Sequence, residues 1–370
     1  MTTTRADLRE LAAALRKALG AGAPSQQPVV DTDWRARWPT LTELGVTAFC
    51  ATEECGGFGD EAPAALTAAR ELGAALHGAP YAGVVAAAHA LSRWLDDPRR
   101  PALLEEIGAG EHIPALAFLD PAATVVERDG EVRVDGRAYL VAGAEEADSF
   151  LCLPPDGDTM VFVPRAGTCT AQSSHAFDVT RSCADIAFTG AQGSPVRAEP
   201  GGRLRVERLH GLLLAGDALG GLERMLERTV GHARERKAFG KAIGGFQAVQ
   251  HRLVDHTVRL RGVSLLAEAA ADRLGTGAPD AGRTVLLAEA AVAEGAVPML
   301  HDLLQLTGAI GFTWEYGLHL YERRAHLDAR LGRNPRQALR SIARHEGWSG
   351  GGRPAGSASA DPSGRHVPTW

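Results

Sequence analysis

The second half of the chain contains long segments in which apolar residues recur every three or four positions, at 212–234, 247–273, 281–306 and 318–330. This period places the apolar residues along one side of an α-helix. Glycine and proline separate the segments, so each helix is expected to end before the next begins. Consecutive helices of this length bury their apolar sides best against one another, and we therefore predict an antiparallel four-helix bundle over residues 209–347.

Helical periodicity also marks the first part of the chain, where turn-forming residues divide it into shorter segments. Apolar stripes predict helices over residues 5–19, 63–76 and 84–95, and a further helical region that begins at Trp34. We therefore predict a helical N-terminal domain over residues 1–111.

Between these two helical parts the pattern changes to short apolar or alternating runs, which are typical of β-strands. The runs lie at 114–118, 124–127, 132–134, 139–141, 150–153, 160–163, 185–188 and 204–207. Asp129-Gly130 and Asp135-Gly136 favour tight turns between strands. We therefore predict a small β-barrel-like domain over residues 112–208. After it and the bundle, residues 348–370 are rich in glycine, serine and proline, which predicts a disordered tail.

Composition sets broad limits on the class of protein. The chain has 370 residues, 45% hydrophobic and 23% charged, which is ordinary for a soluble protein with two or three domain cores. A net charge of −6 argues against nucleic acid as the main partner, and no apolar run approaches the length of a membrane span. The five cysteines are an odd number without metal-ligand spacing, so we expect free thiols in a reducing cytoplasm and no metal site.

Polar residues and glycines gather between the first two bundle segments. Arg236 is expected to end one helix, Phe239 and Gly240 to form the turn that follows, and Phe246 and Gln247 to open the next helix. A guanidinium beside a glycine turn and a helix start suits a phosphate or pyrophosphate, because the cation pairs with the anion and free N–H groups point at it. An ordinary helix–turn–helix with a surface arginine has the same pattern, so these residues alone leave both interpretations open.

The run R-K-A-F-G-K-A-I-G-G-F-Q-A-V-Q-H-R-L at 236–253 resembles the flavin-binding signature of the acyl-CoA dehydrogenase family. A second run, Q-L-T-G-A-I-G-F-T-W-E at 305–315, is similar to another segment of that family. The resemblance implies FAD as the cofactor and the family's order of helical domain, β domain and four-helix bundle. It also implies that the residues in contact with FAD are Arg236, Phe239, Phe246, Gln247, Gln305 and Gly308.

The resemblance implies a reaction whose base is absent from the expected positions. In the family a glutamate removes the α proton of an acyl-CoA while the flavin accepts the β hydride. Counted without gaps, the usual position of that glutamate falls at Gly332, and the position used by a minority of members falls at His210, beside Gly211 where an arginine is expected. We therefore assign no catalytic residue to this chain. We interpret His210 as a helix-start residue that faces solvent or an interface, and a base at His210 or at Glu207 stays open as the alternative.

The β domain also departs from the family in the stretches that meet the flavin ring. The family's T-E-P-x-x-G-S-D loop corresponds to residues 118–121, after which the G-S-D part is missing. The family's N-G-x-K-x-W-I-T corresponds to residues 135–142, which puts Leu140 at the tryptophan and Ala142 at the threonine. Loss of the hydroxyl groups removes hydrogen bonds that the polar edge of a flavin ring requires. The residues that match the family motifs are those that a family member presents to the flavin of its neighbouring subunit. The residues that are missing are those with which a family member holds the flavin of its own subunit.

This distribution predicts an auxiliary subunit of a heteromeric α₂β₂ acyl-CoA dehydrogenase, similar to the non-catalytic chains of actinobacterial enzymes that act on bulky steroid or polyketide-like thioesters. The catalytic glutamate would then lie on a homologous partner subunit, with FAD shared at the subunit interface. The alternative is a homomeric, repurposed enzyme of specialised metabolism that uses His210 or Glu207. A third hypothesis is a non-enzymatic structural or binding protein, so whether the chain is an enzyme by itself stays open.

Overall fold

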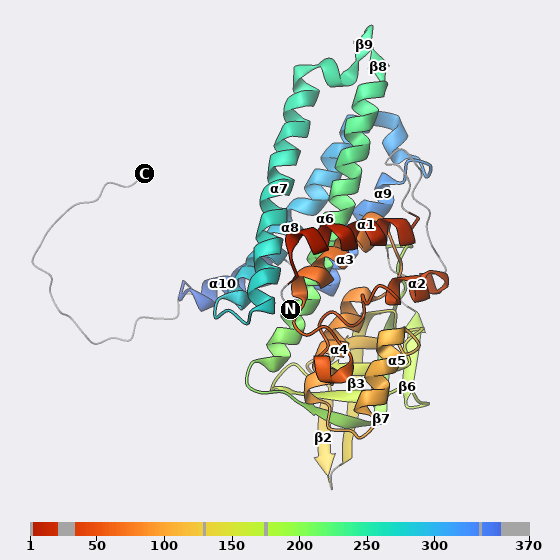
Figure 1. Ribbon diagram of the computed structural model, residues 1–370, viewed down its shortest axis with the longest axis vertical. Coiled ribbons are helices and arrows are strands. Elements are labelled where there is room, and N and C mark those ends of the chain that lie inside the picture. The colour runs from red at the N-terminus through yellow and green to blue at the C-terminus, as the bar shows by residue number, and fades with distance from the viewer. Residues whose placement is uncertain (1–2, 21–33, 129–130, 174–176, 333–334, 349–370) are drawn as a thin grey trace, which may run out of the picture.

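The structure is a computed structural model, and it describes residues 3–20, 34–128, 131–173, 177–332 and 335–348. Residues 349–370, where the sequence predicts a disordered tail, and the predicted turn at Asp129-Gly130 lie outside this description. Figure 1 shows three parts in chain order: helices at the N-terminus, a curled β-sheet, and a helical bundle whose far end projects away from the sheet. The order of helices, sheet and bundle is the one that the sequence predicts.

The N-terminal helices pack on the longest bundle helix. They are α1 (Arg5–Ala18), α2 (Trp38–Thr42), α3 (Ala62–Ala74), α4 (Tyr81–Trp94) and α5 (Arg100–Ala109), with short 3₁₀ turns at Trp34–Ala36 and Glu53–Cys55. Helix α3 crosses α6 (Gly202–Glu235) very closely. A Cβ on Gly73 would lie 2.0 Å from the carbonyl oxygen of Asp217, and one on Gly220 would lie 1.8 Å from that of Arg70. These two glycines therefore allow the backbones to meet, which fixes the N-terminal part against the bundle.

The middle of the chain forms a curled sheet in the order β1-β4-β5-β7-β3-β2, with β6 paired to β7. The strands are β1 (Pro114–Phe118), β2 (Thr124–Arg128), β3 (Glu131–Ala142), β4 (Ser149–Leu153), β5 (Thr159–Pro164), β6 (Cys169–Ser173) and β7 (Cys183–Arg197). Pairs are antiparallel except for β1 with β4. The expected turn at Asp135-Gly136 is wrong: β3 runs through it with a shift in register, because a β-bulge absorbs the extra residue.

The predicted strand over residues 204–207 is also wrong, because α6 already begins at Gly202. Val206 and Leu209 are buried on one side of this helix, and Leu213 continues the same stripe one turn further on. The apparent alternation at 204–207 is thus the first part of a helical repeat, which needs a longer window to be recognised. The first bundle helix consequently starts inside the stretch predicted as the β domain, 112–208.

The bundle is built from α6, α7 (Gln247–Gly275), α8 (Ala281–Thr307) and α9 (Leu318–Leu331), the four helices that the sequence predicts. A further helix, α10 (Pro335–His345), packs on α8 and was not predicted. The stretch Ala281–Phe312 is long and apolar enough to cross a membrane by length and composition, but 56% of its most apolar window is buried inside the protein. This burial is typical of the core helix of a bundle.

Candidate functional site

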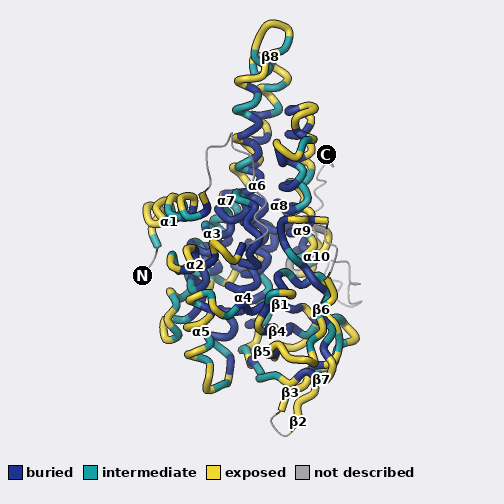
Figure 2. The backbone as a smooth tube through the Cα atoms, turned by 90° about the vertical axis from the view of Figure 1, so that its right-hand side faces the viewer, coloured by how far each residue is buried: buried dark blue, intermediate teal, exposed yellow. Residues whose placement is uncertain are grey.

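The first region of interest is the bundle tip, residues 236–247, where α6 turns into α7 through the hairpin β8 (Lys237–Ala238) and β9 (Lys241–Ala242) and a 3₁₀ turn at Ile243–Gly245. Arg236 ends α6 as predicted, and α7 begins immediately after Phe246. Phe239 and Gly240 take the positive φ angles of 51° and 80° that close the hairpin. Figure 2 shows the tip as an exposed loop far from the sheet.

Side chains at the tip face solvent. Phe239 is 97% exposed, and its ring lies 6.4 Å from that of Phe246, over which the Lys241 ammonium sits at 4.2 Å. Arg236 and Gln247 are exposed as well. An aromatic ring held this far out in water gains nothing for the stability of its own chain, and such groups commonly mark a surface that meets another molecule.

Gln305 and Gly308 lie at the end of α8, and both are exposed. Gly308 has a φ of +66° and leads into a 3₁₀ turn, Gly308–Phe312. This segment is held to α6 near the tip, where the ring of His232, one turn before Arg236, lies 6.2 Å from that of Tyr316. The two stretches that carry the sequence motifs therefore lie toward the same end of the bundle.

The second region is a pocket of about 370 Å³ between the sheet and the bundle, which we call the central pocket. Its walls include Glu207, His210 and Gly211 from α6, and Gly332 at the end of α9. Both positions at which the sequence comparison expects a glutamate, His210 and Gly332, thus lie in one pocket, about 120 residues apart in the chain. Neither carries a carboxylate.

The sheet side of the central pocket is apolar. Leu116, Phe118, Leu140 and Ala142 line it from β1 and β3. Leu140 has a φ of +53° within an irregular part of β3, and its N–H donates to Asp185 Oδ1 at 2.9 Å. Leu140 and Ala142 offer no side-chain hydroxyl to a ligand at this wall, as the sequence predicts.

The surroundings of His210 and Glu207 argue against both of them as the catalytic base. The expectation that His210 starts a helix and faces solvent is wrong, because α6 already begins at Gly202. The side chain is only 6% exposed, and its ring lies 5.6 Å from that of Phe118. Burial, with a smaller contribution from the charge of Arg181, lowers the pKa of His210 to about 4, so this imidazole is neutral at physiological pH and a weak proton acceptor. Glu207 forms an ion pair with Arg203 one turn earlier on α6, so its carboxylate already has a partner on its own helix.

A buried carboxylate that sequence reasoning missed also lines the central pocket. Glu289 on α8 is 5% exposed, and its carboxylate lies against the backbone of Gly211. A Cβ at Gly211 would lie 1.9 Å from Glu289 Oε1, so only glycine leaves room for it. The sequence did contain a signal, because Glu289 falls on the same helical face as the buried Val285 and Val292.

Comparison with known proteins identifies the family. Residues 201–335 match the family model described as acyl-CoA dehydrogenase, C-terminal domain. Acyl-CoA dehydrogenase IpdE2 of Mycobacterium tuberculosis is 32% identical over 311 residues, which span 82% of this chain and 85% of that protein. The chain belongs to the acyl-CoA dehydrogenase family. The family predicted from the two sequence motifs is therefore confirmed.

Solved structures of the same fold include the ChsE4-ChsE5 complex from Mycobacterium tuberculosis, with a TM-score of 0.82, 24% identity and coverage of 95% of this chain and 99% of that one. Another is the Tcur3481-Tcur3483 steroid ACAD variant, with a TM-score of 0.82, 22% identity and coverage of 93% and 99%. A glutaryl-CoA dehydrogenase from Mycobacterium smegmatis in complex with FADH2 has a TM-score of 0.80, 18% identity and coverage of 95% and 97%. The acyl-CoA dehydrogenase fold predicted for this chain is thus confirmed.

Members of this flavoprotein family bind FAD, and the two regions of this acyl-CoA dehydrogenase chain fit that group unequally. The bundle tip offers the Arg236 guanidinium and the first turn of α7, which together suit a pyrophosphate. The central pocket offers leucine and alanine side chains at positions 140 and 142, which do not suit the polar edge of a flavin ring. The chain is therefore equipped for the phosphate part of FAD and poorly equipped for its ring.

A buried ion network connects the sheet to the bundle beside the central pocket. Arg324 is 2% exposed and its Nε lies 2.6 Å from Asp178 Oδ2, while Arg181 lies 2.6 Å from Asp217 and 2.9 Å from Asp328. Burial, and then the negative charge of Asp217, raise the pKa of Asp328 well above its usual range. Burial opposes ionisation of Asp217 too, but Arg181 and Arg324 outweigh it and lower its pKa. Two arginines thus balance two carboxylates, with a proton on Asp328.

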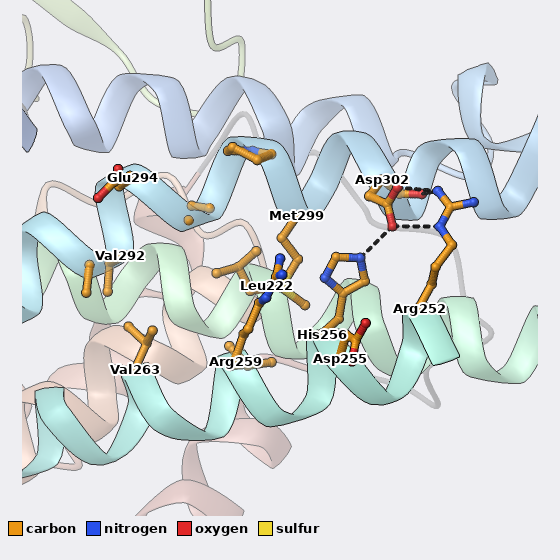
Figure 3. A pocket seen from close by; sticks show the side chains of 15 residues that line it. Leu222, Arg252, Asp255, His256, Arg259, Val263, Val292, Glu294, Met299 and Asp302 are labelled. Atoms are coloured by element: carbon orange, nitrogen blue, oxygen red, sulfur yellow. Dashed lines mark hydrogen bonds and ion pairs between the residues drawn. The ribbon is translucent and has the colours of Figure 1, made fainter. Parts of the chain in front are cut away.

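A third hollow, of about 510 Å³, lies in the groove between α7 and α8, and none of the residues singled out from the sequence lines it. His256 Nε2 and Asp302 Oδ2 are 2.6 Å apart, and the Arg252 guanidinium donates to both oxygens of the same carboxylate, as Figure 3 shows. Met299 and Val263 line the apolar part of the groove. The three polar side chains contact one another across the groove and tie α7 to α8, while the buried Nδ1 of His256 has no hydrogen-bond partner among the described residues.

Proposed function

We propose that this acyl-CoA dehydrogenase-family chain is an auxiliary subunit of a heteromeric, FAD-dependent enzyme that introduces a double bond between the α and β carbons of a bulky acyl-CoA thioester. The observation that carries the proposal is the contrast between the exposed bundle tip, which retains Arg236 and Phe239, and the central pocket, which has glycine at position 332. Such a chain lends residues to a flavin held mainly by another subunit.

In this proposal each motif residue has a task at the subunit interface. Arg236 pairs with the pyrophosphate of FAD, and Phe239 and Phe246 cover the ADP part from the tip of the hairpin. Gln247, Gln305 and Gly308 complete the same surface. FAD supplies the hydride acceptor when bound, and the partner subunit, a homologous chain, supplies the glutamate that removes the α proton.

Two findings support a heteromeric enzyme with a bulky substrate. The fold neighbour ChsE4-ChsE5 is described as a complex, and Tcur3481-Tcur3483 is described as a steroid ACAD. The apolar walls and about 370 Å³ of the central pocket also suit an apolar group, although the reaction itself is proposed for the partner's pocket.

The test is the flavin content of the protein purified with and without its partner. Expressed alone, the chain is expected to hold little or no FAD, because Leu140 and Ala142 cannot bond the flavin ring. Co-expressed with a homologous subunit that carries the family glutamate, it is expected to copurify as a yellow complex with dehydrogenase activity. Stoichiometric FAD in the protein purified alone would contradict the auxiliary assignment.

The second candidate function is a homomeric, repurposed acyl-CoA dehydrogenase-like enzyme of specialised metabolism that uses His210 or Glu207. The observation in its favour is that both side chains do line the central pocket. This function requires the protein purified alone to be yellow and to lose about two to four powers of ten in rate on His210→Ala or Glu207→Gln, the usual worth of a positioned general base. With the pKa of His210 at about 4, its activity would decline only below that pH.

A further inference from the structure

The central pocket has no task under the proposed function, and yet its interior is chemically organised. Two titratable side chains face it from inside the protein, His210 at 6% exposure and Glu289 at 5%. Taking a carboxylate out of water costs free energy even where other groups of the protein interact with it. The position of Glu289 therefore calls for an explanation.

The space for Glu289 comes from Gly211. Any side chain at position 211 would collide with the carboxylate, whose Oε1 lies 1.9 Å from the ideal Cβ position. The family resemblance puts an arginine at position 211, so two changes belong together: removal of that arginine and entry of a carboxylate from α8. The same carboxylate also borders Gly332, since Glu289, Gly211 and Gly332 line a small adjoining cavity together. Glu289 thus lines the same pocket as both positions at which family members carry their glutamate.

His210 complements this carboxylate. Its imidazole is neutral, because burial lowers its pKa to about 4, and a neutral imidazole carries an N–H that can donate to a carbonyl oxygen. It precedes Gly211 directly in α6, so the donor and the carboxylate reach the pocket from adjacent points. A carboxylate paired with a neutral imidazole is suited to removing a proton next to a carbonyl group, since one accepts the proton while the other stabilises the oxygen.

We propose that Glu289 is a proton acceptor for a carbonyl compound bound in the central pocket, with the His210 N–H directed at the carbonyl oxygen. The bond between the α carbon and its hydrogen breaks and the proton moves to a Glu289 carboxylate oxygen. The electron pair forms a carbon–carbon double bond, and the carbonyl π electrons move to oxygen, giving an enolate. The same carboxylic acid returns a proton to the α carbon. The step needs no oxidant, so it goes beyond the proposed function and is independent of it.

The pocket also indicates the class of compound. Its sheet side is formed by Leu116, Phe118, Leu140 and Ala142, which favour an apolar substituent next to the carbonyl. Arg330 lines the pocket from α9 and can pair with an anionic part of the ligand. An acyl thioester of coenzyme A with an apolar acyl group has both features, and its α hydrogen is acidified by the thioester carbonyl.

The test is exchange of α hydrogen for deuterium by the full-length chain in D2O, followed by mass spectrometry. The probes are cyclohexylacetyl-CoA and butanoyl-CoA, incubated with the protein without added flavin. We expect deuterium at the α carbon of at least one probe, and a rate lower by about two to four powers of ten for Glu289→Gln, which keeps the shape of the side chain. The matched control is Glu294→Gln, an exposed charge on the same helix, with exchange equal to that of the parent.

His210 is tested in the same assay. His210→Leu should lower exchange by about 100- to 1,000-fold, the usual worth of one donor to a developing oxyanion, and His210→Gln, which keeps an N–H, should recover part of it. Absence of exchange with both probes would overturn the proposal, and so would parent-like exchange by a Glu289→Gln variant whose thermal melting is unchanged. The flavin content of the co-expressed complex is measured separately, so failure here leaves the auxiliary assignment untouched, and the converse also holds.

Discussion

The bundle tip and the central pocket differ in what surrounds their side chains. At the tip, Arg236 and Phe239 match the family motif although little in their own chain contacts them. In the central pocket, Gly211 and Glu289 depart from the family and yet fit one another closely. A surface residue without partners in its own chain is best explained by a molecule outside it, whereas a buried residue has to satisfy its neighbours. This contrast is what the two proposals predict: a tip that serves a partner subunit and a pocket that serves this chain.

The largest expected effect concerns buried charge. Arg324→Met removes the cation that pairs with Asp178 and one of the two that pair with Asp217, and breaking a buried ion pair in this way should cost roughly 3–5 kcal/mol of unfolding free energy. The matched control is Arg133→Met, which removes an exposed pair with Glu131 and should change stability by at most about 1 kcal/mol. Urea unfolding of both variants measures the difference. Equal losses of unfolding free energy in the two variants would show that the buried network contributes no more to stability than the exposed ion pair does.

A substitution at the bundle tip should leave stability unchanged and weaken the binding of FAD instead. Arg236→Ala is expected to leave unfolding of the chain unchanged within about 0.5 kcal/mol, because Arg236 is exposed. In the co-expressed complex it should weaken FAD retention by about 1.5–3 kcal/mol, which is the worth of a charge-assisted contact to a pyrophosphate. Arg234→Ala, a nearby exposed arginine outside the motif match, is the control for net charge. Fluorescence titration of released FAD measures retention, and equal retention in the two variants would refute the role given to Arg236.

A smaller effect tests the fit between Gly211 and Glu289. Gly211→Ala should destabilise the chain by about 1–3 kcal/mol, because the new methyl group collides with the carboxylate. In a Glu289→Ala background the same change should be neutral or stabilising by up to about 1 kcal/mol, since alanine favours a helix. Gly231→Ala on the same helix, where nothing lies within 4 Å of the added Cβ, should behave in this second way in the parent. Additive effects of the two changes would mean that the residues do not touch.

The smallest expected effect concerns the proton on Asp328. Its pKa is raised in the folded protein, so between the ordinary value of about 4 and that raised value only the folded state holds the proton, and stability falls as pH rises. Asp328→Asn imitates the protonated group and can donate to Asp217, so it should change stability by no more than about 1 kcal/mol near pH 4. As pH rises, the variant should gain on the parent. Thermal unfolding at several pH values measures this, and a parent that holds or increases its stability relative to the variant as pH rises would contradict the assigned proton.

Local patterns were sufficient for most of the fold. The long bundle helices α6 to α9 were predictable because each buries one continuous apolar stripe, and β1 matches its predicted range residue for residue. The predictions failed where the apolar pattern was short, or where it was compatible with both the strand repeat and the helix repeat. The first turns of α6 were taken for a strand, and β6, with mostly exposed small and polar residues, gave no apolar signal. Helix α10 is short and follows closely on α9, so its start was not recognised.

The sequence by itself determined the family, the architecture and the loss of a glutamate at the usual positions, because motifs and periodicity are properties of consecutive residues. It also determined which end of the bundle carries Arg236 and Gln305. Only the tertiary structure decided what fills the vacated space. The sequence showed at Gly211 only the loss of an arginine, and the structure places Glu289, 78 residues later in the chain, against its backbone. A base at His210 was an open alternative in the sequence, and the structure shows that burial lowers the pKa of this residue to about 4. Contact and desolvation arise between residues distant in the chain, and no local pattern encodes them.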